Sequence, residues 1–413
     1  MCTKGGISMQ NKQYYTKENL TPDINCALLP PVVITGELTK TRHYHPDYRG
    51  WQSAPCIVRT PGGRLLCTFS GDNSLQPDET PNNYNLICIS DDDGATWREE
   101  WIIDHPDSVR MHEPILWIAP DGALWHFWAQ SYNWWDGRAG VWAMRCQNPE
   151  AERLTWSQPR RLCHGVLATT PMAARNGEWY FPVSVWKHFP STYNSLPELA
   201  FSNLYISRDS GETLEYVGSA NEPTTTFDEN CVAERPDGSF LMIMRTHNSI
   251  ASSESFDRGK TWSTPVPMMD SPSSRSFLAR FPSGNLLLIA HHDFLEPELD
   301  AQGNPTGRQY GNRKNMTAFL SEDGGKTWPW NLLLDSQRNI SYPAGMITPD
   351  GRAYVAYDHE RYRDREIWYT SFTEEEIRQG KLIHPESFRK KLLCKSGRFR
   401  GENGKIYESG EDD

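Results

Sequence analysis

The chain has 413 residues, 37% of them hydrophobic and 23% charged, and a formal net charge of -11. This acidic balance argues against a nucleic-acid partner, because no stripe of lysine and arginine is present to neutralise phosphates. Nine cysteines occur without a C-x-x-C pair, and no glycine-rich phosphate loop follows a strand, so we expect no metal and no cofactor. The N-terminal stretch is polar, and no window approaches 18 uninterrupted apolar residues. We therefore expect a soluble protein without a membrane partner, either cytoplasmic or secreted after processing.

In chain order, one short pattern recurs six times: an apolar run, a turn rich in Pro, Asp, Asn and Gly, and a second apolar run. The turns lie at residues 61–63, 120–122, 176–177, 236–238, 282–284 and 349–351. Such turns join adjacent antiparallel strands, and they recur about every 60 residues, the length of a four-stranded blade. The pattern predicts an all-β, six-bladed β-propeller over residues 27–382. An N-terminal extension (1–26) precedes it and a C-terminal tail (383–413) follows it, and we expect a strand near Ala27–Thr35 to close the ring.

A second pattern, Ser-x-Asp-x-Gly-x-Thr-Trp, is superimposed on the first. It occupies Ser90–Trp97, Ser255–Trp262 and Ser321–Trp328, with a weaker copy at Ser207–Leu214. In such a turn the Asp accepts hydrogen bonds from backbone amides, and the Gly adopts a positive φ. The pattern resembles the Asp-box of sialidases and their relatives, where it lies between the third and fourth strands of a blade, away from the active site.

The resemblance to sialidases implies a site built from the ends of the inner strands. Members of that family bind the carboxylate of the sugar with three arginines, use an Asp as acid/base, and use a Tyr activated by a Glu as nucleophile. A phenol suits this substrate because a carboxylate nucleophile would be repelled by the carboxylate on the anomeric carbon. The implied function is an exo-acting glycoside hydrolase that releases a terminal acidic sugar, such as sialic acid, from a glycan partner.

Residue by residue, the resemblance assigns a role to five positions. Three are catalytic: Tyr342 in ISYPAGMITPDG as nucleophile, Glu229 in FDENCVAERPDG as its base, and Asp78 in DETPNNYNLICIS as acid/base. The other two, Arg245 in LMIMRT and Arg313 before an Asp-box strand, would bind the acidic sugar. Asp72 competes with Asp78 for the acid/base role. The family's first arginine has no counterpart, because Ser53 stands where that arginine is expected in Gln52-Ser53-Ala54-Pro55. An uncharged Ser cannot replace a bidentate arginine.

Two alternatives follow from the remaining residues. Histidines near strand ends, above all His112 and His247, suit acid/base chemistry near neutral pH. They allow a polysaccharide lyase, or another hydrolase acting on uronic-acid-containing glycans, in which a Tyr acts as the acid. Trp134 and Trp135 offer apolar platforms for sugar rings. The missing arginine also allows a non-catalytic propeller that only binds carbohydrate.

Overall fold

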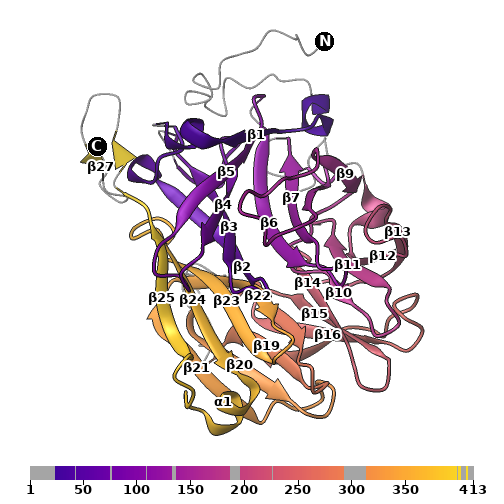
Figure 1. Ribbon diagram of the computed structural model, residues 1–413. Coiled ribbons are helices and arrows are strands. Elements are labelled where there is room, and N and C mark those ends of the chain that lie inside the picture. The colour runs from indigo at the N-terminus through magenta and orange to yellow at the C-terminus, as the bar shows by residue number, and fades with distance from the viewer. Residues whose placement is uncertain are drawn as a thin grey trace, which may run out of the picture.

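The computed structural model of the chain describes residues 24–41, 43–74, 77–107, 109–132, 136–186, 196–225, 227–292, 313–397, 399–400 and 406–407. Nearly all of this part is β-structure, in six antiparallel sheets arranged as the blades of a ring (Figure 1). The first strand of a sheet contacts the first strands of neighbouring sheets, so these strands surround the central axis. The all-β, six-bladed propeller predicted from the sequence is confirmed.

Each blade consists of consecutive strands, ordered from the axis outward. Blades 1 to 3 contain β2 (Trp51–Arg59), β3 (Leu65–Asp72), β4 (Tyr84–Ser90) and β5 (Arg98–Asp104); β6 (Arg110–Ile118), β7 (Leu124–Ser131), β8 (Val141–Cys146) and β9 (Arg160–Cys163); and β10 (Met172–Ala173), β11 (Trp179–Ser184), β12 (Ser202–Ser207) and β13 (Glu215–Ala220). Blades 4 to 6 contain β14 (Asn230–Glu234), β15 (Phe240–Arg245), β16 (Ser249–Ser255) and β17 (Val266–Asp270); β18 (Phe277–Arg280), β19 (Leu286–His291), β20 (Lys314–Ser321) and β21 (Trp330–Arg338); and β22 (Ile340–Ile347), β23 (Arg352–His359), β24 (Glu366–Thr373) and β25 (Phe388–Lys395).

Besides these strands, the described residues form a few short elements. They are β1 (Val32–Thr35), the 3-10 helices η3 (Ile24–Leu28), η4 (Gly36–Lys40), η5 (Pro46–Tyr48) and η6 (Pro197–Leu199), the helix α1 (Glu374–Gln379), and the pair β26 (Phe399–Arg400) and β27 (Ile406–Tyr407). The six predicted turns all join the first strand of a blade to its second. Their glycines have φ between +81° and +98°, a conformation that favours glycine over residues with a Cβ.

The ring closes differently from the sequence-based expectation. The N-terminal strand β1 pairs with β5 at the outer edge of blade 1 and does not complete blade 6. Blade 6 takes its fourth strand from β25, which follows α1 and pairs with β24. The propeller therefore extends past residue 382 into the segment that the sequence suggested as a tail. The run Arg389–Lys391 concealed this strand, because an exposed outer strand tolerates charged side chains.

Each of the four Asp-boxes lies between the third and fourth strands of its blade, as predicted. In the box of blade 4, the Ser255 hydroxyl donates to Asp257 (2.8 Å) and accepts from the Gly259 amide (2.7 Å). The amide and hydroxyl of Thr261 both donate to the Asp257 carboxylate, at 2.9 and 2.6 Å. The same bonds recur in the other three boxes, so the motif is a repeated structural clasp.

The Asp-boxes predict how stability depends on pH. Hydrogen bonds from the threonine hydroxyl and amide lower the pKa of Asp257, like those of Asp92 and Asp209, to about 2. A lowered pKa in the folded state adds stability above the unfolded value near 4, and this stability is lost as the pH falls toward 2. We expect Asp257→Asn to lower the Tm at neutral pH, with the difference from the wild type shrinking between pH 4 and pH 2. Thermal melts followed by circular dichroism measure it, and a difference that stays constant over this range would contradict the account.

The described residues lack two further features. None of their helices is long and apolar enough to cross a membrane. Nor do they contain a group of three or more His, Cys, Asp or Glu side chains arranged to hold a metal ion.

Candidate active site

The candidate site lies at the end of the propeller where the first strands of the blades begin. Each first strand runs from this end to its hairpin, and the Asp-box turns lie at the hairpin end as well. The first residues of these strands, and the residues just before them, therefore lie at one end of the axis. The strands concerned are β2, β6, β14, β18 and β22. Such convergence of chain segments is typical of sites on a repeated scaffold.

A recurring distortion shapes three of these strands. In blades 1, 2 and 6 the residue before a proline has a positive φ: +55° at Ala54, +50° at Glu113 and +57° at Tyr342. The register of each strand shifts at the same point. A bulge of this kind redirects a side chain, and proline is tolerated there because it need not donate to the sheet. Non-glycine residues in this region carry about 1–3 kcal/mol of strain each, which indicates a functional demand on these positions.

Tyr342 is surrounded by guanidinium groups. Its side chain is 8% exposed. The guanidinium carbons of Arg275, Arg313 and Arg361 lie 4.5, 5.0 and 4.3 Å from the centre of its ring. Within the described part of the chain, its hydroxyl makes no hydrogen bond. The phenol ring therefore lies against three guanidinium groups, of which Arg275 and Arg361 also pair with the carboxylates of Glu113 and Asp358.

Arg313 links the phenol to two more of the residues predicted from the sequence, Arg245 and Glu229. Arg245 donates to the Glu229 carboxylate at 2.7 Å, and both side chains are almost fully buried. Arg245 and Arg313 both donate to the carbonyl oxygen of Ser273, at 3.2 and 2.7 Å. Burial, together with the nearby charges of Arg245 and Arg361, lowers the pKa of Arg313. The two predicted arginines are thus held side by side on one backbone oxygen.

A second buried ion pair was not found from the sequence. Arg275, just before β18, bonds to the Glu113 carboxylate and to the carbonyl oxygen of Ala168. Burial raises the pKa of Glu113, and the neighbouring carboxylates of Glu229 and Glu79 act in the same direction. Glu113 thus faces the charged cluster, in the position of blade 2 that corresponds to Tyr342 in blade 6.

The position of the missing arginine is occupied in a different way. The Ser53 hydroxyl donates to Asp358 at 2.6 Å. Arg361, in the loop after β23, contacts both oxygens of the same carboxylate at 3.2 Å and donates to the Ser341 hydroxyl at 2.6 Å. A guanidinium group is therefore present next to Ser53 and Tyr342, although it comes from another segment of the chain.

The acid/base candidates lie in the loop between β3 and β4. Asp78 is exposed and accepts a hydrogen bond from the Tyr362 hydroxyl at 3.0 Å, which places it beside the loop that carries Arg361. The neighbouring Glu79 pairs with Arg110 at 3.1 Å and with Arg361 at 3.6 Å.

The competing Asp72 has a different environment. It is buried and accepts hydrogen bonds from Thr80 and Asn83, while burial raises its pKa. Its contacts hold the loop together, so Asp78 remains the better candidate for the acid/base.

The two predicted histidines have surroundings of their own. His112 is buried and shares a hydrogen bond of 2.8 Å with the Ser131 hydroxyl, and burial lowers its pKa well below the usual range. His247 is half-buried in the turn between β15 and β16, two residues after Arg245. Trp134 and Trp135 lie outside the described residues.

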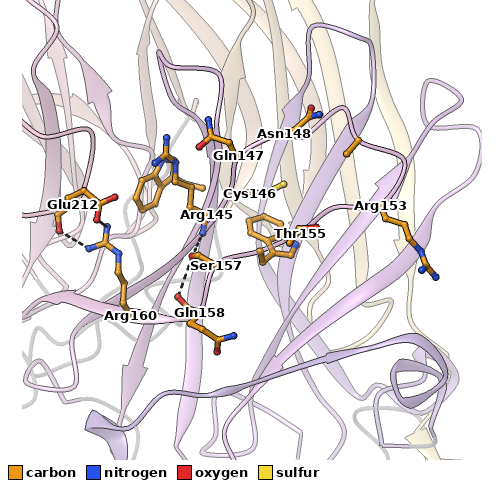
Figure 2. A pocket seen from close by; sticks show the side chains of 13 residues that line it. Arg145, Cys146, Gln147, Asn148, Arg153, Thr155, Ser157, Gln158, Arg160 and Glu212 are labelled. Carbon is orange, nitrogen blue, oxygen red and sulfur yellow. Dashed lines mark hydrogen bonds and ion pairs between the residues drawn. The ribbon is translucent and has the colours of Figure 1, made fainter.

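A groove elsewhere on the protein is distinct from this site. Its lining includes Arg145 of β8, Arg160 of β9 and Glu212 of the Asp-box in blade 3 (Figure 2), and its volume is about 610 Å³. The guanidinium carbons of Arg160 and Arg145 lie 5.6 and 5.5 Å from the centre of the Trp125 ring. On the first strand of blade 2, the partner of Trp125 is Trp117, which lies five residues past His112 toward the hairpin. The groove therefore opens at the hairpin end of the blade.

Comparisons with known proteins agree with this architecture. A protein from Dyadobacter fermentans, described as of unknown function, has 18% identity and a TM-score of 0.57, over 81% of this chain and 94% of its own. The Hadza microbial sialidase Hz136 has 20% identity and a TM-score of 0.57, over 81% of this chain and 68% of its own. The intramolecular trans-sialidase from Ruminococcus gnavus, in complex with oseltamivir carboxylate, has 14% identity and a TM-score of 0.55, over 82% and 97%. At these identities the likeness shows the fold.

No match was found among curated proteins. The model of the BNR repeat-like domain, however, matches residues 86–355, a range that contains all four Asp-boxes. This match covers more than half of the chain, and the chain therefore belongs to the family of BNR repeat-like proteins, with the six-bladed propeller that sialidases share.

Proposed function

We propose that this protein is a glycoside hydrolase of sialidase type that releases a terminal acidic sugar from a glycan. The observation that carries the proposal is the phenol of Tyr342 with three guanidinium groups within 5.0 Å of its ring centre. A neutral phenol among fixed positive charges suits attack on a sugar whose carboxylate lies next to the reacting carbon. Arg245, Arg313 and Arg361 would bind this carboxylate, and bidentate contacts would orient the sugar.

Substrate binding would also release the base. In the structure Arg245 donates to the Glu229 carboxylate. A substrate carboxylate that takes over Arg245 would free Glu229 to accept the phenol proton, because Arg245 cannot serve both carboxylates equally well. Hydrogen bonds at a catalytic site are often completed only when substrate binds.

The proposed reaction has two steps. The Tyr342 oxygen bonds to the anomeric carbon as the glycosidic bond breaks; the phenol proton goes to Glu229, and protonated Asp78 gives its proton to the leaving oxygen. Water then attacks the same carbon, Asp78 takes a proton from the water, and the phenolate leaves and recovers its proton from Glu229. Two inversions give net retention of configuration. The lyase alternative is less well supported, because its base, His112, is buried and shares a hydrogen bond with Ser131, and burial lowers its pKa well below the usual range, which makes it a weak base.

A panel of chromogenic glycosides tests the proposed function. We expect turnover of sialosides or other acidic glycosides and none of neutral glycosides, with proton NMR showing that the first free sugar retains the configuration of the substrate. Inversion, or equal turnover of neutral glycosides, would contradict the mechanism. Absorbance from an unsaturated uronate would identify a lyase instead, and binding without turnover would identify a carbohydrate-binding propeller.

A further inference from the structure

Arg275 connects blades that lie across the ring from one another. It belongs to the segment before β18 in blade 5, and its side chain is 2% exposed. Its guanidinium group bonds to Glu113 of blade 2 and to the Ala168 carbonyl oxygen before blade 3, and it lies 4.5 Å from the ring centre of Tyr342 in blade 6. A single side chain thus contacts three other parts of the propeller at the base of the site.

This arrangement is costly to build, which argues against a passive role. A buried guanidinium requires a partner, because desolvation of the charge costs several kcal/mol. Glu113 provides the opposite charge, and it does so from a left-handed backbone conformation before Pro114, which itself carries strain. Apolar residues of similar volume would fill the same space at lower cost.

The position of the charge relative to Tyr342 suggests what it does. The guanidinium lies against the phenol ring and is held from the opposite side of the axis, so it cannot move away when the charge on the ring changes. In the proposed mechanism the Tyr342 oxygen is an uncharged ether oxygen while the sugar is attached to it. In the second step the bond to the sugar breaks and Tyr342 leaves as a phenolate. A fixed cation beside the ring lowers the energy of that second transition state without contributing to substrate binding.

We propose that Arg275, anchored by Glu113, is a positioning residue that fixes the Tyr342 ring and stabilises the departing phenolate when the glycosyl intermediate is hydrolysed. This inference rests on the proposed function. It predicts a defect in the second step alone. The intermediate should then accumulate, and KM should not rise.

The test compares Arg275→Met, Arg275→Lys and Glu113→Gln in stopped-flow assays with an acidic chromogenic glycoside. We expect kcat to fall about 100-fold in Arg275→Met and less in Arg275→Lys, which keeps the charge. Glu113→Gln should also lower kcat. In all three variants KM should be unchanged or lower, and a burst of chromophore should precede the slow steady state.

Controls separate this role from a structural one. Arg235→Lys alters a buried arginine that pairs with Glu254 at 2.6 Å at the hairpin end, and it should leave kcat and KM unchanged. Thermal melts exclude unfolded variants. A rise in KM without a burst, or no advantage of Arg275→Lys over Arg275→Met, would overturn the inference. If the wild type itself forms no glycosyl intermediate, the proposed function fails; if it does and Arg275→Met turns over normally, only this inference fails.

Discussion

Tyr342→Phe is expected to abolish turnover of acidic glycosides and to leave their binding almost unchanged. The substitution removes only the hydroxyl, whereas the contacts of the ring with Arg275, Arg313 and Arg361 are kept. Loss of a nucleophile lowers kcat by about 1,000-fold or more. Steady-state kinetics give kcat, and calorimetric titration with the product sugar gives the Kd.

The stability of this variant should change little, because the hydroxyl makes no hydrogen bond to a described residue. Tyr369→Phe is a matched control, since Tyr369 is a buried tyrosine of β24 with its hydroxyl directed to the Asp93 carbonyl near an Asp-box. That variant should retain full activity. Normal turnover by Tyr342→Phe would remove the phenol from the mechanism.

The second large effect is expected at Arg361. Removal of its guanidinium group in Arg361→Ser should raise the KM for acidic glycosides. A charge-assisted hydrogen bond contributes about 1.5–3 kcal/mol, which corresponds to a loss of affinity on the order of 10- to 100-fold. The KM for neutral glycosides should not change, because the effect depends on the carboxylate of the substrate.

A relocated charge provides the decisive control for Arg361. Ser53 and Arg361 share the Asp358 carboxylate, so an arginine at position 53 can bond to the same partner. The double variant Ser53→Arg/Arg361→Ser should recover a large part of the lost affinity. Arg352→Ser, at the other end of β23, serves as the control for loss of a buried arginine. Failure of the double variant to recover affinity, in a folded protein, would show that Arg361 does not take the place of the missing arginine.

The fold could be predicted because its signals are local. A Pro-Asp-Gly turn and an Asp-box each complete their hydrogen bonds within a few residues, so each reports its own structure without knowledge of the rest of the chain. The fourth strand of blade 6 gave no such signal. It is an outer strand with three consecutive basic residues, Arg389–Lys391, and only its pairing with β24 defines it.

Residues of the candidate site could be named from the sequence only where they lie at a fixed spacing from a turn. Tyr342, Glu229 and Arg245 were found because each sits near the start or end of a strand next to a recognisable hairpin. Arg275 and Glu113 are 162 residues apart in the sequence, and nothing in the serine-rich segment around Arg275 indicates its partner. One signal was available: Ala54, Glu113 and Tyr342 all precede a proline near the start of a first strand.

The most direct test of the account is covalent trapping. A fluorinated acidic glycoside slows the second step, so the intact protein should gain the mass of one glycosyl group, and peptide mapping should place that group on Tyr342. The label should be absent from Tyr342→Phe. A glycosyl group on Glu229, Glu113 or another carboxylate would contradict the central claim that the phenol is the nucleophile, and so would turnover of the probe without any labelled protein.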